Sequence, residues 1–336
     1  MMRRLSMVLL MTLGCSPSSP NHRPPDNPPP PGGKRVLTVD QYEELVYGPG
    51  PKATFAATTA IEHQAIEALI PKLLEGARSA TPPDPLAWQA EAAAGGFRIE
   101  VWSVGNETYW ALLEAQPTHG AGAYIVRVSA TQDTGPMILL EAPHNFFDMG
   151  TGRLAADLFF TPRKGARPRA LFTNTMHRYQ QAPGDKRKRK NNPADVAHQP
   201  DHAFTIATVA FARVADHVRV SQVHGFGQRI DEGDNEGVVS DIDMVVSAGE
   251  ALGSTPTSAA IADALVKVFG TKVKRYPEEA KVLGATTNAQ GKLLRGLPNS
   301  RFIHVEMSGD LRKQLAGDAA LRERFAVALF DTGDPP

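Results

Sequence analysis

From residue 97 to residue 330, short apolar runs alternate with segments of helical spacing, and this alternation restricts the fold more than any other feature. The runs expected to form strands cover residues 97–104, 108–114, 123–129, 137–141, 170–173, 218–223, 244–247 and 302–307. Helical spacing is found at residues 154–160, 203–216, 258–269 and 310–330. Asn106, between the first two runs, indicates a hairpin. The pattern predicts a three-layer α/β domain around a buried, mixed central sheet.

The chain divides by composition into four parts. Residues 1–14 have the basic start and short apolar stretch of an export signal, which is too short to span a bilayer. Residues 15–35, rich in Pro, Ser, Asn and Gly, predict an extended tether. Residues 36–84 predict a helical segment interrupted at Pro51 and Pro71. Residues 85–332 are expected to form the α/β catalytic domain.

Cys15, the sole cysteine, follows the export signal directly and resembles the lipidated first residue of a mature bacterial lipoprotein. The alternative is an ordinary signal peptide with an incidental cysteine. The resemblance implies an exported, lipid-anchored protein of the bacterial cell envelope. We expect such a protein to contact the membrane only through the lipid on Cys15.

The charges balance, with 36 Lys and Arg against 36 Asp and Glu, and this argues against nucleic acid as a partner. A single cysteine excludes both an internal disulfide and a thiolate-rich metal site. Any metal must therefore bind to His and carboxylate ligands. The basic run at residues 186–190 is expected to be a solvated loop, and the alternative is that it attracts an anionic substrate or envelope polymer.

Two of the predicted strands end close to potential metal ligands. The run 137–141 leads to His144 and then to Asp148, and the run 218–223 leads directly to His224. Functional residues of open α/β sheets collect beyond the carboxyl ends of strands, so these side chains can converge on one cation. Zinc accepts imidazole nitrogen and carboxylate oxygen in a small tetrahedral shell. We therefore expect one Zn²⁺ ion held by His144, Asp148 and His224.

Two further strand ends supply candidate catalytic and binding groups. Glu306 lies near the end of the run 302–307 and is expected to act as general base on metal-bound water. Arg178 follows the run 170–173, and its planar fork suits a bidentate contact with a substrate carboxylate. The alternative for Arg178 is a surface ion pair. Its neighbour His177 is a candidate substrate-binding donor on the oxyanion side or a structural residue.

The order of these motifs resembles that of the zinc carboxypeptidases and their amidohydrolase relatives, including N-formylglutamate amidohydrolases and poly-γ-glutamate hydrolases. The resemblance covers roughly residues 135–312 and implies a phosphorylase/hydrolase-like fold, one zinc ion and amide hydrolysis by an activated water. Carboxypeptidases have Glu three residues after the first His, whereas Asp148 comes four residues after His144. Glu141 is therefore the alternative carboxylate ligand. His177 occupies the place of an Asn that precedes the family's Arg.

Two other clusters have a structural interpretation as well as a functional one. Asp195 and His198 suggest a second metal cluster, but capping of the 203–216 helix by Asp201 is the favoured role for this segment. In that case His198 can still line the site. The acidic residues 231–236 do not have the spacing of an EF-hand loop, so we expect a flexible loop there.

Together these features predict a zinc-dependent hydrolase that cleaves an amide bond next to a carboxylate-bearing group in a small molecule or peptide. Cell-wall peptides, poly-γ-glutamate and N-acylated amino acids all contain such an amide. The alternative is a non-catalytic envelope lipoprotein that binds a peptide, a glycan or a metal without turnover.

Overall fold

The computed structural model describes residues 34–48, 54–115, 118–129, 135–181, 192–227, 229–230, 237–238 and 241–332. Cys15, the basic run 186–190 and the acidic residues 231–236 lie outside these residues, so the expectations about them stay predictions. Among the helices of the described segments, none is long and apolar enough to cross a membrane.

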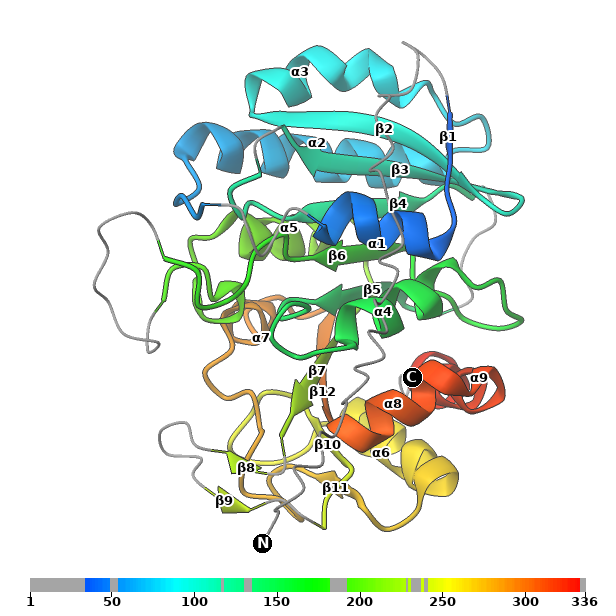
Figure 1. Ribbon diagram of the computed structural model, residues 1–336, viewed down its shortest axis with the longest axis vertical. Coiled ribbons are helices and arrows are strands. Elements are labelled where there is room, and N and C mark those ends of the chain that lie inside the picture. Colours follow the sequence, from blue (N-terminus) through cyan, green and yellow to red (C-terminus); the bar gives the residue numbers. More distant parts are fainter. Residues whose placement is uncertain are drawn as a thin grey trace, which may run out of the picture.

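A ten-stranded mixed sheet forms the centre of the molecule (Figure 1). Its strand order is β1-β2-β3-β4-β6-β5-β7-β12-β10-β11. The strands are β1 (Arg35–Val36), β2 (Phe97–Val104), β3 (Glu107–Glu114), β4 (Ala123–Arg127), β5 (Met137–Ala142), β6 (Ala170–Thr173), β7 (Val218–Phe226), β10 (Met244–Ser247), β11 (Val273–Arg275) and β12 (Ser300–Ser308). A separate antiparallel pair consists of β8 (Arg229–Ile230) and β9 (Gly237–Val238).

The middle of the sheet is parallel. Strands β6, β5, β7 and β12 are neighbours that run in the same direction, whereas β2, β3 and β4 form antiparallel pairs at one side. All six residues of β5 are buried, as expected for a strand that is covered on both faces. The prediction of an α/β domain with a mixed central sheet is confirmed.

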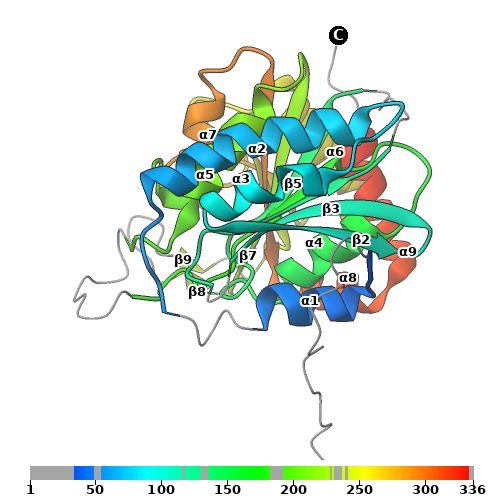
Figure 2. The same cartoon turned by 90° about the horizontal axis from the view of Figure 1, so that it is seen from above.

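Helices cover both faces of the sheet (Figure 2). One face carries α1 (Val39–Tyr47), α4 (Thr151–Phe160), α6 (Pro256–Phe269), α8 (Gly309–Gly317), α9 (Ala319–Ala326) and the π-helical turn η5 (Val327–Asp331). The other face carries α2 (Ala60–Arg78), α3 (Gln89–Ala94), α5 (Ala203–Ala212), α7 (Ala289–Leu294) and the short 3₁₀ turns η2 (Pro85–Trp88) and η3 (Val196–His198). Each face buries its own hydrophobic core, because alternate strand residues point to opposite sides.

Two predicted helices differ from those in the structure. Pro71 does not interrupt the helical segment but lies inside α2, whose Ile70 and Leu73 are fully buried. Packing of this apolar face maintains the helix across the proline, although the proline removes a backbone donor. The predicted helix at residues 310–330 is divided at Asp318, whose side chain accepts a hydrogen bond from the backbone N–H of Leu321 and starts α9.

An ion pair ties α2 to the loop between β3 and β4. The Nε2 of His119 donates to Oε1 of Glu62 over 2.7 Å. Burial opposes the charge on Glu62, but hydrogen bonds from His119 and Thr59 prevail and lower its pKa to about 2. The same contact with Glu62 raises the pKa of His119 to about 9 against the effect of burial.

We expect Glu62→Gln to lower the free energy of unfolding most between the ordinary pKa values of 4.5 for Glu and 6.5 for His. Glu62 has a depressed pKa, so its contribution is lost as the pH falls from 4.5 towards about 2. His119 has a raised pKa, so its contribution is lost as the pH rises from 6.5 through about 9. Urea unfolding across this range, with the exposed Glu67→Gln as control, measures the difference. A loss that does not vary with pH would contradict this linkage.

Candidate metal centre

Three adjacent parallel strands bring the predicted site residues to one edge of the sheet. Glu306 of β12 is the register partner of His224 on β7, and β5 on the other side of β7 leads to His144. After β5 the chain turns sharply, because the backbone N–H of Asp148 donates to the carbonyl of His144 over 2.8 Å. This turn returns the Asp148 side chain to the two imidazoles.

The structure brings the three predicted ligands together. The Nδ1 of His144 lies 3.6 Å from Oδ2 of Asp148, and the Nδ1 of His224 lies 3.2 Å from the same oxygen. All three side chains are buried, and their ligand atoms lie within 4.8 Å of one another. Tetrahedral zinc with ligands at about 2.1 Å needs its donors roughly 3.4 Å apart. The donor spacing therefore fits a single small cation.

The second ring nitrogen of each imidazole, Nε2, contacts a side chain that is not one of the three ligands. The Nε2 of His144 lies 2.8 Å from Oδ1 of Asp195, and the Nε2 of His224 lies 3.2 Å from Oε1 of Gln222. Because the amide nitrogen of Gln222 donates to Glu141 over 2.7 Å, its oxygen is the atom left to accept from His224. An engaged Nε2–H leaves the lone pair of Nδ1 directed at the centre. Metal-binding histidines commonly have this support.

Glu141, the alternative ligand, belongs to none of the groups of potential metal ligands that the described residues form. Its carboxylate is fully buried and accepts hydrogen bonds from Thr208 over 2.5 Å and from Gln222 over 2.7 Å. Burial raises the pKa of Glu141 to about 7, although these two hydrogen bonds oppose the shift. Glu141 thus supports Gln222, and the structure places Asp148 beside both imidazoles.

Glu306 lies beside the ligand group. Burial raises its pKa to about 8, and the nearby negative charge of Asp148 adds to the shift. Its Oε2 has no hydrogen-bond partner among the described residues. A buried carboxylate oxygen without a partner is costly in a folded protein unless it faces a ligand or water.

His304 is a site residue that the sequence reasoning missed. Its Nε2 lies 3.7 Å from Oε1 of Glu306, its ring centroid lies 4.5 Å from that of His224, and its buried Nδ1 has no partner in the described part of the chain. Alternation along a strand places residues 304 and 306 on the same face, so this signal was available in the sequence. Together, His224, His304 and Glu306 form a second group of ligand atoms within 4.8 Å.

Arg178 forms an ion pair, as the alternative interpretation predicts, but the pair is buried and not at the surface. Its Nε and Nη2 donate to Oδ2 of Asp195 over 3.1 and 2.5 Å, and its Nη1 lies 3.2 Å from Nδ1 of His144. The guanidinium also lies over the rings of Phe147 and Tyr179, at 5.4 and 5.1 Å from their centroids. Asp195 therefore engages two of the three nitrogens and His144 the third, so Nη1 can contact a substrate only when it leaves Nδ1 of His144.

Asp195 belongs to this centre. Besides His144 and Arg178, it contacts Nδ1 of His198 over 3.1 Å. These interactions hold the pKa of Asp195 far below its ordinary value, although burial acts in the opposite direction. The expected cap at Asp201 is wrong, because His202 caps α5 by accepting from the backbone N–H of Phe204 over 3.0 Å.

His177 lies outside the groups of potential metal ligands that the described residues form. Its Nδ1 accepts a hydrogen bond from the backbone N–H of Tyr179 over 3.1 Å, and its ring packs edge-on against Phe147 at 5.7 Å. These contacts shape the turn that presents Arg178. The substrate-binding role predicted for His177 stays a prediction.

The protonation states of His224 and Asp148 favour a cation. The pKa of His144 is raised, because the charge of Asp195 and its hydrogen bonds outweigh burial and the charge of Arg178, so a cation there would displace a proton. Burial lowers the pKa of His224 to about 4, so its imidazole is neutral and has a lone pair at neutral pH. The two neighbouring imidazoles hold the pKa of Asp148 well below its ordinary value in spite of burial. Asp148 is therefore ionised between two imidazoles, which is the donor set that zinc prefers.

We expect Asp195→Asn to weaken zinc binding by roughly 10- to 100-fold, because His144 loses the carboxylate that orients it. The change also leaves Arg178 buried without its partner, which costs about 3–5 kcal/mol of stability. Zinc titration and urea unfolding measure the two effects. Asp263→Asn is the control, since Asp263 is 61% exposed and lies 3.7 Å from Arg275. Equal behaviour of the two variants would contradict a supporting role for Asp195.

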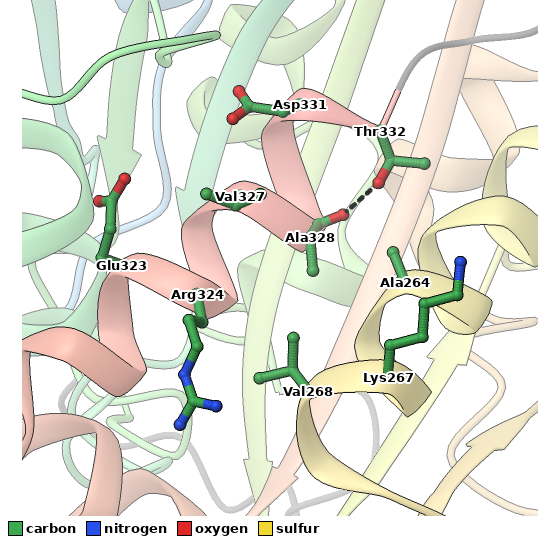
Figure 3. Close-up of a pocket in the computed structure, with 9 residues that line it drawn as sticks. All are labelled: Ala264, Lys267, Val268, Glu323, Arg324, Val327, Ala328, Asp331 and Thr332. Carbon is green, nitrogen blue, oxygen red and sulfur yellow. Dashed lines mark hydrogen bonds between the residues drawn. The ribbon is translucent and has the colours of Figure 1, made fainter.

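A separate hollow of about 360 Å³ lies between α6, α9 and η5 (Figure 3). Its wall is mostly apolar, and charged side chains lie at its edge. The lining residues are Ala264, Lys267, Val268, Glu323, Arg324, Val327, Ala328, Asp331 and Thr332. None of them belongs to the metal centre, so the hollow and the ligand group are separate features.

No protein-family model and no curated protein matches the chain. Among solved structures, it aligns with an N-formylglutamate amidohydrolase from Ralstonia eutropha JMP134 at 11% identity, covering 58% of this chain and 92% of the other with a TM-score of 0.32. An aspartoacylase family protein from Mesorhizobium loti aligns at 14% identity over 68% of each chain, with a TM-score of 0.34. A proposed metallopeptidase from Shewanella amazonensis SB2B aligns at 13% identity over 83% of this chain and 99% of the other, with a TM-score of 0.33.

N-formylglutamate amidohydrolases are among the proteins that the sequence motifs resemble. At this level of overlap the alignments assign no ligand and no reaction to this chain. The roles of individual residues therefore depend on the geometry of the centre.

Proposed function

We propose that this chain is a zinc-dependent hydrolase that cleaves an amide bond next to a carboxylate-bearing group. The observation that carries the proposal is the buried group of His144, Asp148 and His224, with Glu306 beside it. Three protein ligands and an unpartnered carboxylate oxygen are what an open catalytic zinc site requires. On the sequence evidence, we propose that the enzyme is lipid-anchored at Cys15 in the bacterial cell envelope.

Bound zinc would polarise the substrate carbonyl and lower the pKa of a water molecule to about 7. Glu306 then acts as the base of the reaction and takes the proton of the attacking water on its free Oε2. The same oxygen passes this proton to the leaving amine. Burial makes the Glu306 carboxylate a stronger base than an exposed one, and the positive charge of bound zinc would keep it ionised at neutral pH.

Arg178 supplies a positive charge at the ligand group. Its Nη1 faces the Nδ1 of His144, and a cation bound there would take up that lone pair. Nη1 is then left to donate to a substrate oxygen, either the developing oxyanion or the neighbouring carboxylate. The bidentate contact with a substrate carboxylate that the sequence predicts is reduced to this single contact, because Asp195 accepts from Nε and Nη2.

The test is metal content and hydrolysis by the purified full-length chain. We expect about one zinc ion per chain, loss of activity on chelation and recovery on addition of zinc. A panel of N-acylated amino acids and γ-glutamyl peptides, each paired with its carboxylate methyl ester, reports on the substrate class. Free carboxylates should be hydrolysed faster than their esters. Absence of zinc, or no hydrolysis of any member of the panel, would contradict the proposal.

A further inference from the structure

Arg312 occupies a place where a cation is not expected. It lies in the first turn of α8, which begins at Gly309, and the positive end of the helix dipole disfavours a basic residue there. In the described part of the chain its guanidinium donates hydrogen bonds to the backbone carbonyls of Met149 and Met307 and not to a carboxylate. A specific reason for its position is therefore needed.

The guanidinium of Arg312 contacts three backbone segments. Its Nε donates to the carbonyl of Met149 over 2.9 Å, and its Nη1 donates to the carbonyl of Met307. It also lies against Gly225, where a Cβ atom would be 2.0 Å from Nη1 and 2.3 Å from Cζ. Each of these three residues directly follows a residue of the metal centre.

Gly225 is needed for space and not for an unusual backbone conformation. Its φ is not in the left-handed region, so an alanine can adopt the same backbone. An added methyl group would instead overlap the guanidinium of Arg312. A glycine within a strand often marks such a close approach.

We propose that Arg312 is a positioning residue that fastens together the backbone just beyond Asp148, His224 and Glu306. This inference rests on the proposed function. It adds that the contacts of Arg312 fix the distances between the two ligands Asp148 and His224 and the base Glu306. The three backbone segments are the loop before α4, β7 and β12, and only tertiary packing brings them together. Displacements of about 1 Å in a catalytic group can reduce rates by 100-fold, so a device that fixes this spacing has a large effect.

The electrostatic environment of Arg312 supports the inference. Burial lowers its pKa, and the negative charges of Asp148 and Glu306 oppose that shift. The guanidinium is thus within the field of both carboxylates while its hydrogen bonds go to the adjacent backbone. This arrangement lets it influence the centre without occupying a ligand position.

The test compares Arg312→Met, Gly225→Ala and the double variant in the full-length chain. We expect each single variant to bind zinc roughly 10- to 100-fold more weakly, measured by competition with a chromophoric chelator. The double variant should bind no more weakly than either single variant, because both changes disrupt the same contact. Arg324→Met is the control, since Arg324 lies on α9 at the separate hollow.

A second readout needs no metal. Amide hydrogen exchange at Asp148 and Thr151, whose N–H groups bond to His144 and Asp148 carbonyls, should be faster in Arg312→Met than in Arg324→Met. If wild type binds zinc and the zinc affinity is unchanged in Arg312→Met or Gly225→Ala, the positioning role of Arg312 is overturned and the proposed function stands. Losses of zinc affinity that add up in the double variant also overturn the positioning role. If wild type binds no zinc, the proposed function fails, and exchange alone decides whether Arg312 fixes the loop.

Discussion

Replacing Glu306 with glutamine should lower the rate of amide hydrolysis by roughly 10²- to 10⁴-fold and leave zinc bound. Glutamine has the size of glutamate but cannot take a proton from water. Glu306 is not one of the three expected ligands, and the burial of its carboxylate raises its pKa to about 8. Steady-state kinetics together with zinc analysis of the same preparation measure both halves of the prediction.

The matched control is Glu75→Gln, which changes an exposed carboxylate on α2 and should leave kcat and zinc content unchanged. Full activity in Glu306→Gln would exclude Glu306 as the base. A wild-type chain that binds zinc and hydrolyses nothing would instead favour the non-catalytic binding protein. Loss of zinc in Glu306→Gln would show that the carboxylate is a ligand.

Replacing either His144 or His224 with alanine should reduce zinc affinity by more than the roughly 100-fold expected for loss of a supporting residue. Each change removes a buried Nδ1 donor and leaves two protein ligands, which is one fewer than catalytic zinc sites use. Hydrolysis should fall in parallel, because metal and activity are lost together. Zinc stoichiometry after dialysis and zinc titration of the metal-free protein check this prediction.

His217→Ala is the control for both variants, because His217 is exposed and lies just before β7. Its zinc content should equal that of wild type. Unchanged zinc in both His144→Ala and His224→Ala would remove the ligand assignment. Loss in only one of them would move the site to one of the other ligand groups that share that histidine.

The sequence predicts the central strands well because their apolar runs are buried on both faces. β2, β6 and β10 have the predicted bounds, and β5, β7 and β12 extend the predicted runs by a few residues. The convergence of His144, His224 and Glu306 follows from one general rule, since parallel strands end at the same edge of a sheet. This rule does not predict the strand order, and it is the strand order that makes β5, β7 and β12 neighbours.

The contributions of Asp195 and Arg312 depend on packing between distant segments. Asp195 lies on the connection between β6 and α5, and its spacing to His198 is compatible with a cap, a metal ligand or an ion pair. Only the fold shows that it holds both His144 and Arg178. The contact of Arg312 with Gly225 joins α8 to β7, and no local pattern indicates it. His304, by contrast, could have been found from its alternation with Glu306.

The most direct test of the central claim is a crystal structure of the zinc-loaded chain with anomalous diffraction at the zinc edge. We expect one strong peak about 2.1 Å from Nδ1 of His144, Nδ1 of His224 and a carboxylate oxygen of Asp148. The carboxylate of Glu306 should face the open side of that ion. A peak bound by other side chains, or none at this edge of the sheet, would contradict the assignment of these three ligands.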